Sequence, residues 1–380
     1  MNHILIIAGE ASGDMHGAGF VREFLQIRPD CRFFGLGGDM MAKAGVNLTY
    51  HIKSLAFFGF WEVLRNLWFL RHVKKELLSL ADELQPKMAV LIDYPGFNLR
   101  LAPKLKKRGV KIFYYISPQI WAWGEKRVNK IRNSVDMMAT IFEFEKDIYE
   151  KAAIPVKWVG HPLIDTVKIS LTEEEFRHKA DLEDNDILIG LFPGSREQEV
   201  KKILPEMLSA LKVIKDKNIK GVISRSPALD ESVYREVIDR YGINVTVLEG
   251  INYELMAYAK MNIVCSGTAT LECAIIGTPM VVVYKTSFVT YCIARNLVKI
   301  PDIGLVNVVA GKRIVPELIQ NDCTAENIAD ITMKYLEDDK YYRLVKEQLS
   351  HIKSKLGDSG AAKKAAVAAV ELMQSDITKT

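Results

Sequence analysis

Short apolar runs alternate with helical patterns along the chain and form two successive series. The first series contains Ile4–Ala8, Arg32–Gly35, Met88–Ile92, Lys111–Ile116, Met137–Ile141 and Val156–Val159, and the second contains Ile187–Phe192, Gly221–Ser224, Asn244–Leu248, Met261–Cys265 and Met280–Tyr284. Continuous apolar runs separated by helices are typical of parallel strands that are covered on both faces. The sequence therefore predicts an α/β protein with two doubly wound parallel sheets in tandem.

The chain has 380 residues, which is long enough for two domains that each bury a core. We expect a first Rossmann-like domain over residues 1–168 and a second over residues 186–354. The charged stretch Ile169–Asp186 separates them. Residues 355–380 contain AAKKAAVAAVELMQ, whose alanines favour a terminal helix. We expect this helix to pack back on the first domain or on a partner subunit.

Composition excludes several classes of protein. The net charge of +4 is too small to indicate a nucleic-acid partner. Five cysteines without a CxxC pair argue against a disulfide framework and fit a reducing, cytoplasmic compartment. No signal peptide and no apolar stretch long enough to cross a bilayer is recognisable. The histidines lack metal-ligand spacing and GxSxG is absent, so we expect neither a metal site nor a serine hydrolase.

Ligands of open parallel sheets bind beyond the carboxyl ends of the strands, so the loops after the apolar runs are the candidate binding sites. The first is AGEASGDMHGAG, which is neither GxGxxG nor a P-loop. Ser12 or Asp14 is a natural helix cap there. Helix capping accounts for one of these residues but less well for the four polar residues of the loop together. Carboxylates are better suited to bind sugar hydroxyls than phosphate. The candidate residues of this loop are Gly9, Glu10, Ser12, Gly13, Asp14 and His16.

Two further loops of the first domain hold polar candidates. Asp93 directly follows the run MAVLI, within LIDYPGFNLRLA, where it is either a turn aspartate or a catalytic acid. Gln119 lies in YISPQIWAWGEKR with two tryptophans, which are either core residues or rings that stack on a sugar or a base.

Two loops of the second domain indicate an anion site. LFPGSREQEV places Gly194, Ser195 and Arg196 at a helix start, where N–H groups and a guanidinium can bind phosphate. Ser195 as a plain cap with Arg196 in solvent is the alternative. SGTATLE places Ser266, Gly267 and Thr268 before a second helix, and Glu272 one turn later can accept hydrogen bonds from ribose hydroxyls.

The segment LAFFGFWEVLRNLWFL is more apolar than one core-facing helix surface requires. It is either a deeply buried helix or an interfacial helix that contacts a membrane or acyl chains. The residues that would make such contact are Phe60, Trp61, Leu64, Trp68 and Phe69.

The motifs AGEASGD, GFWEVL, the Asp93 loop, SPQIWAW, VGHPLID, FPGSREQEV and SGTATLE occur in this order over nearly the whole chain. This set resembles the lipid-A-disaccharide synthases. The resemblance implies a GT-B type glycosyltransferase, with two Rossmann-like domains that face a cleft. It implies transfer of diacylglucosamine from UDP-2,3-diacylglucosamine to the 6-hydroxyl of 2,3-diacylglucosamine 1-phosphate, with inversion, in lipid A (lipopolysaccharide) biosynthesis. Neither a metal nor another cofactor is implied.

The resemblance also implies roles for individual residues. Asp93 matches the general base, Arg196 and Ser266–Thr268 would meet the diphosphate, and Glu272 would meet the ribose. Asn307, in GLVNVVAG, would be a polar contact to UDP. The first glycine-rich loop and Gln119 would line the acceptor side. Gly96 stands where the family commonly has an acid, and Val306 where proline is common, which puts the geometry of these two loops in doubt.

An enzyme with acylated substrates and no membrane-spanning helix has to work at a membrane surface. We therefore expect a peripheral protein at the inner face of the cytoplasmic membrane, and a homodimer is a further expectation. The alternatives are another GT-B transferase with a UDP-sugar donor and a lipid-linked acceptor, a UDP-sugar epimerase, and an inactive nucleotide-sugar binding protein.

Overall fold

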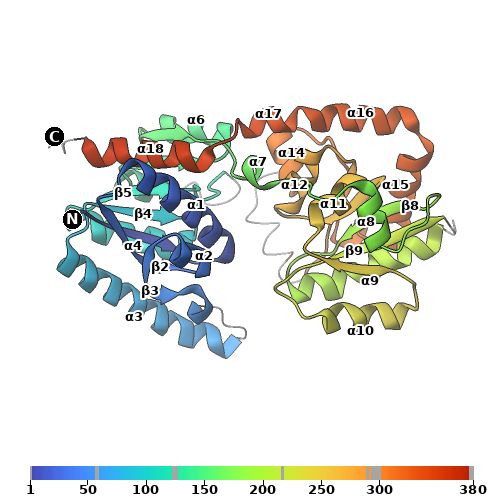
Figure 1. Ribbon diagram of the computed structural model, residues 1–380, viewed down its shortest axis with the longest axis horizontal. Coiled ribbons are helices and arrows are strands. Elements are labelled where there is room, and N and C mark those ends of the chain that lie inside the picture. Colours follow the sequence, from blue (N-terminus) through green and yellow to red (C-terminus); the bar gives the residue numbers. More distant parts are fainter. Residues whose placement is uncertain are drawn as a thin grey trace. The chain divides into compact units, whose positions relative to one another are not determined.

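The computed structural model describes residues 2–55, 60–121, 127–214, 218–287, 291 and 301–375, but not the side chains of residues 55 and 60–67. The chain divides into two compact units. Unit 1 consists of Met1–Pro162 and Gly357–Thr380, and unit 2 consists of Leu163–Leu356. Each unit has one parallel sheet with helices packed on it (Figure 1).

The described part of unit 1 forms a seven-stranded sheet in the order β3-β2-β1-β4-β5-β6-β7, and every pair of neighbours is parallel. Its strands are β1 (Asn2–Ala8), β2 (Cys31–Gly37), β3 (Val46–His51), β4 (Met88–Ile92), β5 (Lys111–Tyr115), β6 (Met137–Thr140) and β7 (Val156–Trp158). Its helices are α1 (Ala11–Ile27), α2 (Asp39–Lys43), η1 (Ile52–Leu55), α3 (Phe60–Leu84), α4 (Pro95–Lys106), α5 (Val128–Arg132), α6 (Glu143–Lys151) and α18 (Ala361–Gln374).

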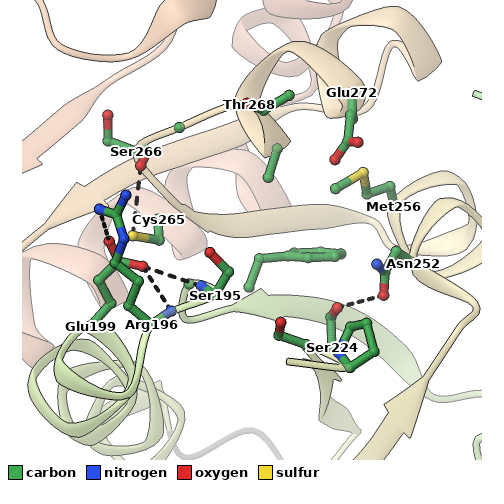
Figure 2. Close-up of a pocket in the computed structure, with 16 residues that line it drawn as sticks. Ser195, Arg196, Glu199, Ser224, Asn252, Met256, Cys265, Ser266, Thr268 and Glu272 are labelled. Atoms are coloured by element: carbon green, nitrogen blue, oxygen red, sulfur yellow. Dashed lines mark hydrogen bonds and ion pairs between the residues drawn. The ribbon is translucent and has the colours of Figure 1, made fainter. Parts of the chain in front are cut away.

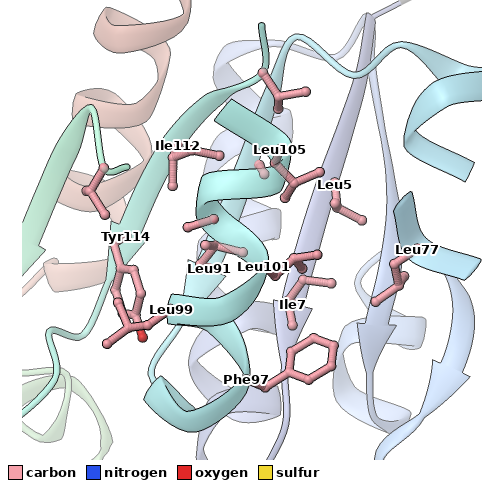
Figure 3. Close-up of a cluster of buried hydrophobic side chains, with 14 of the residues drawn as sticks. Leu5, Ile7, Leu77, Leu91, Phe97, Leu99, Leu101, Leu105, Ile112 and Tyr114 are labelled. Atoms are coloured by element: carbon pink, nitrogen blue, oxygen red, sulfur yellow. The ribbon is translucent and has the colours of Figure 1, made fainter. Parts of the chain in front are cut away.

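Alternate residues of β1 enter two different cores, because successive side chains of a strand point to opposite faces. Leu5 and Ile7 belong to a buried cluster with residues of α3 and α4, as Figure 3 shows. On the helix α1 side, the ring of Phe20 lies 6.0 Å from that of Phe113 and 6.4 Å from that of Phe33. Burial on both faces explains why these strands are apolar throughout.

The C-terminal helix α18 packs within unit 1, which is the first of the two positions expected for it. It lies along α1 and near β5 and β6. Its alanines Ala365, Ala366, Ala368 and Ala369 are fully buried. At its end, Lys111 Nζ donates to the carbonyl of Leu372 at 2.9 Å, and Lys157 Nζ lies 3.0 Å from Glu371 Oε2.

Unit 2 repeats the topology, with a six-stranded parallel sheet over the described residues in the order β10-β9-β8-β11-β12-β13. Its strands are β8 (Ile187–Phe192), β9 (Ile219–Arg225), β10 (Thr246–Glu249), β11 (Met261–Cys265), β12 (Met280–Tyr284) and β13 (Glu317–Ile319). Its helices are α7 (Leu163–Thr166), α8 (Glu173–Lys179), α9 (Glu197–Ile214), α10 (Glu231–Tyr241), α11 (Asn252–Tyr258), α12 (Ala269–Ile276), α14 (Leu305–Ala310), η3 (Gln320–Asp322), α15 (Ala325–Glu337), α16 (Asp339–Ser350) and α17 (Ile352–Leu356).

The division between the units lies at Pro162 and Leu163, before the expected separator Ile169–Asp186. The reason is that this separator packs into unit 2. The carboxylate of Glu254 accepts hydrogen bonds from the N–H of Ser170 at 2.8 Å and from its hydroxyl at 2.6 Å. The ring of Phe176 lies 5.6 Å from that of Tyr258.

The predicted fold class is confirmed, since both units are doubly wound parallel sheets. Two strands were not among the predicted runs. β3 and β13 are edge strands with the sequences VNLTYH and ELI, so neither shows the continuous apolar pattern of a central strand.

Candidate functional site

Each sheet reverses its strand order at one place, and the loops there are natural ligand sites. In unit 1 the reversal lies between β1 and β4, which are paired with Ala8 opposite Ile92. In unit 2 it lies between β8 and β11, with Phe192 opposite Val264. The glycine-rich loops singled out from the sequence follow these strands.

A pocket of about 380 Å³ opens at the reversal point of unit 2 (Figure 2). Its walls come from the loops after β8, β9 and β11 and from helices α9, α11 and α12. The lining residues are Phe192, Gly194, Ser195, Arg196, Glu199, Ser224, Ser226, Pro227, Asn252, Met256, Cys265, Ser266, Gly267, Thr268, Ala269 and Glu272. The pocket thus brings together seven of the eight residues that the sequence assigned to UDP.

The loop after β8 presents its donors to a carboxylate of the same chain. The N–H groups of Ser195 and Arg196 each donate to Glu199 Oε2 at 3.2 Å. The Arg196 guanidinium lies 3.4 Å from Glu199 Oε1, and its side chain is 78% exposed. Gly194 has φ 113°, and a Cβ there would lie 2.5 Å from Glu199 Oε2, so glycine is required.

The loop after β11 supplies backbone donors at the start of α12. Ser266 itself is committed within the protein, because its N–H donates to Val283 at 3.0 Å and its hydroxyl to the carbonyl of Ile303 at 2.9 Å. Within the described residues, the N–H groups of Gly267 and Thr268 have no acceptor in the protein. These two groups, at a helix start, are suited to an anion.

Glu272 stands at another wall of the pocket and is supported by a residue that the sequence did not single out. The hydroxyl of Tyr253 donates to Glu272 Oε1 at 3.3 Å. Burial raises the pKa of the Glu272 carboxyl. Ser224 and Asn252 are also new, and the Ser224 hydroxyl donates to Asn252 Oδ1 at 2.6 Å. The loops after β9 and β10 follow predicted strands, so the strand-end rule could have indicated them.

Asn307 does not line this pocket, although the sequence assigned it to UDP. Its amide nitrogen donates to Val315 O at 3.0 Å and to Glu317 Oε1 at 2.7 Å. Its amide oxygen accepts from the N–H of Ile314 at 2.8 Å and of Val315 at 3.1 Å. Glu317 in turn accepts from the N–H of Ile303 at 2.9 Å. Asn307 therefore stabilises, through Glu317, the segment that contains Ile303. The carbonyl of Ile303 in turn accepts the hydrogen bond from the Ser266 hydroxyl.

Asp93 occupies the end of β4 in unit 1 with left-handed backbone, φ 43°. Its carbonyl accepts from the Tyr114 hydroxyl at 2.6 Å and from the amide nitrogen of Asn98 at 2.8 Å, which fixes this unusual conformation. Burial raises the pKa of its carboxyl from 3.8 to about 6, and the nearby charge of Glu10 adds to the effect. A carboxylate with this pKa is a suitable general base near neutral pH.

The glycine-rich loop after β1 borders Asp93. The ring of Tyr94 lies against Gly9, where a Cβ would be 2.3 Å from a ring carbon. Glu10 is the N-cap of α1 but makes no side-chain capping bond, and both Glu10 and Ser12 are exposed. Gly13 packs against Ala8. Glu10 and Ser12 are therefore free to meet a ligand.

Asp14 is held by backbone N–H groups of a neighbouring segment. Its carboxylate accepts from the N–H of Gly38 at 2.7 Å and from those of Met40 and Met41 at 3.0 Å each. These bonds cap the start of α2, so Asp14 is a buried brace, and its contact with the acceptor stays a prediction.

His16 and Gln119 differ in environment. Burial lowers the pKa of His16 to about 4, and burial together with His16 lowers that of His161 to about 3. The two imidazoles are therefore neighbours and neutral near neutral pH. Gln119 is exposed in the loop after β5.

The apolar helix α3 is described only in part at its start. The side chains of Phe60, Trp61 and Leu64 lie outside the described residues. Trp68 is 71% exposed and stacks on the ring of His72. The ring of Phe69 is partly buried and packs on Tyr50 and against the core of unit 1, and its expected contact with a membrane stays a prediction.

Metal-binding clusters and membrane-spanning helices are both absent from the part of the chain that the structure describes. The described residues contain no group of three or more histidine, cysteine, aspartate or glutamate side chains placed to hold a metal ion. Among their helices, none combines the length and the apolar character needed to cross a membrane.

Comparison with known proteins relates the chain to one family. A family model described as Lipid-A-disaccharide synthetase matches residues 4–371. The lipid-A-disaccharide synthase of Geobacter sulfurreducens is 38% identical over 378 residues, 99% of this chain and 98% of the relative. That of Syntrophus aciditrophicus is 40% identical over 374 residues, 98% of each chain.

Solved structures share the fold at low identity. A UDP-GlcNAc 2-epimerase from Neisseria meningitidis bound to UDP-GlcNAc aligns with a TM-score of 0.61 at 15% identity, over 97% of this chain and 98% of that one. A glycosyltransferase from Rickettsia africae aligns with a TM-score of 0.61 at 13% identity, over 98% of each chain. These likenesses concern the fold alone.

The raised pKa of Asp93 predicts how stability changes with pH. A carboxyl with a pKa of 3.8 when unfolded and about 6 when folded loses stability as the pH rises from about 4 to about 6. We therefore expect Asp93→Asn to raise the free energy of unfolding by about 1–3 kcal/mol near pH 8 and by much less near pH 4. Urea unfolding at both pH values measures this, with the exposed Asp330→Asn as control. A loss of stability near pH 8 would contradict it.

Proposed function

The chain belongs to the lipid-A-disaccharide synthase family, and we propose that it joins UDP-2,3-diacylglucosamine to 2,3-diacylglucosamine 1-phosphate and releases UDP. The observation that carries the proposal is the pocket of unit 2. Its donors lie on two adjacent loops, after β8 and β11, and a carboxylate stands on another wall. A nucleoside diphosphate needs this combination, with donors for phosphates and an acceptor for ribose hydroxyls.

In this reaction unit 2 holds the leaving group. Arg196 and the N–H groups of Gly267 and Thr268 would stabilise the charge that develops on the diphosphate as its bond to the anomeric carbon breaks. Tyr253 would keep the Glu272 carboxylate oriented toward the ribose, since it already donates to one oxygen. Arg196 can reach a ligand without disturbing the core because its side chain is mostly exposed.

Asp93 would act as the general base. The 6-hydroxyl oxygen of the acceptor attacks the anomeric carbon, its proton passes to Asp93, and UDP leaves with the electron pair of the broken bond. Attack from the face opposite to UDP inverts the anomeric carbon. The pKa of about 6 leaves Asp93 ionised near neutral pH, yet makes it a stronger base than an ordinary aspartate. Glu10, Ser12 and Gln119 are exposed polar groups that could meet the acceptor.

The direct test is to incubate the purified chain with UDP-2,3-diacylglucosamine and 2,3-diacylglucosamine 1-phosphate. We expect disaccharide 1-phosphate and UDP in equal amounts, detected by mass spectrometry. Asp93→Asn should lower kcat by about 10²-fold or more, because proton transfer by a side chain contributes this much. Release of an epimerised sugar, or no disaccharide at all, would contradict the proposal.

We further propose that the protein works at the inner face of the cytoplasmic membrane. Trp68 is exposed on α3, and a basic cluster from α3 and α4 surrounds Lys74 further along the same helix. Partial burial, with repulsion from Lys104, Arg100 and Arg71, lowers the pKa of Lys74. Such a cluster suits anionic lipid headgroups. A homodimer would need a surface other than the buried face of α18, which is covered within unit 1.

Trp68→Ser tests this membrane surface. Loss of the exposed indole should lower partition to anionic liposomes about tenfold and leave the fold intact. A flotation assay measures the change, and Leu344→Ser, which removes a 50% exposed apolar side chain from unit 2, is the matched control. Equal partition of the Trp68 variant and the unchanged protein would rule out the contact.

A further inference from the structure

We infer that Glu199 is an internal carboxylate that occupies the phosphate donors of the unit 2 pocket and is displaced by the diphosphate of the donor substrate. The inference rests on the proposed function of this pocket. Three donors of two residues converge on Glu199, namely the N–H groups of Ser195 and Arg196 and the guanidinium of Arg196 (Figure 2). These are the groups at the start of α9 that would bind a phosphate.

Glu199 accepts more hydrogen bonds than a helix-capping carboxylate requires. A carboxylate at the third residue of a helix commonly accepts from the N-cap N–H, and Glu199 makes that bond with Arg196. It also takes the N–H of Ser195 and lines the pocket with only 14% of its side chain exposed. Gly194 makes room for it, since a Cβ would lie 2.5 Å from Glu199 Oε2. The carboxylate is therefore inside the pocket, where a ligand oxygen would bind.

Carboxylate and phosphate cannot share these donors. Within the described residues, Arg196 is the cation paired with Glu199. The other titratable groups near Glu199, Cys265 of β11 and Tyr284 of β12, stay neutral because burial raises their pKa values. A diphosphate that takes Arg196 and the two N–H groups leaves Glu199 unpaired and close to like charge. This repulsion weakens UDP binding and favours departure of UDP after transfer.

Glu199→Gln tests the inference, because glutamine keeps an acceptor oxygen for the loop and removes the charge. Calorimetric titration with UDP should show binding about tenfold tighter than in the unchanged protein. Uridine, which lacks phosphates, should bind equally well to both. Glu199→Ala should also bind UDP more tightly, since it frees the donors altogether. Glu197→Gln is the matched control, because it removes a charge from the same turn but one paired with Lys201 at 2.7 Å.

The outcomes separate the inference from the proposed function. Weaker or unchanged UDP binding in both Glu199 variants, with normal uridine binding, would show that Glu199 braces the loop for phosphate and would overturn the inference. Weaker binding of both UDP and uridine would show that Glu199 stabilises the folded pocket, and this result would also overturn the inference. If the unchanged protein binds neither UDP nor uridine, the proposed function of the pocket fails, and the inference fails with it.

Discussion

The structure depends on the reversal of strand order in each parallel sheet. Successive strands are added to the sheet in one direction from β1 and in the other from β4, and likewise from β8 and β11. The loops at the carboxyl ends of these two strands therefore separate and leave room for a ligand. In unit 2 this room is the pocket between the loops after β8 and β11. In unit 1 the same constraint places Glu10 near Asp93, because Ala8 and Ile92 are paired neighbours. The order of the strands thus determines where a ligand can bind, and the side chains of the loops determine which ligand.

Partly buried carboxylates set the electrostatic character of both loop regions. Burial and the nearby charge of Glu10 raise the pKa of Asp93, and burial raises the pKa of Glu272 against the opposite effect of the hydrogen bond from Tyr253. Asp14 is more fully buried than either, but three N–H groups satisfy it as a brace of α2. The two aspartates thus differ in the hydrogen-bond partners of their carboxylates. Asp93 keeps a carboxylate that can take a proton, and its strained backbone is held by Tyr114 and Asn98.

Much of this could be predicted from the sequence, because central parallel strands are apolar throughout and the loops that follow them are short. β4, β8, β11 and β12 have the predicted bounds. The roles of Asp14, Phe69 and Asn307 could not be predicted, since a polar or aromatic residue looks the same whether it binds a ligand or supports a distant segment. Asp14 caps a helix 24 residues away or more, and Asn307 braces residues beyond its own helix. Glu199 lines the pocket from the first turn of α9, and Tyr253 acts on it only through its hydrogen bond to Glu272, so neither role was visible in the strand-end loops.

The central claim is that Asp93 takes the proton from the attacking hydroxyl. The most direct test is the pH dependence of kcat/KM for disaccharide formation in the unchanged protein and in Asp93→Asn. The account predicts that kcat/KM of the unchanged protein rises about tenfold per pH unit below about pH 6 and then levels off, as the base ionises. In Asp93→Asn the residual rate should lack this rise. A rise with the same midpoint in both proteins would contradict the assignment.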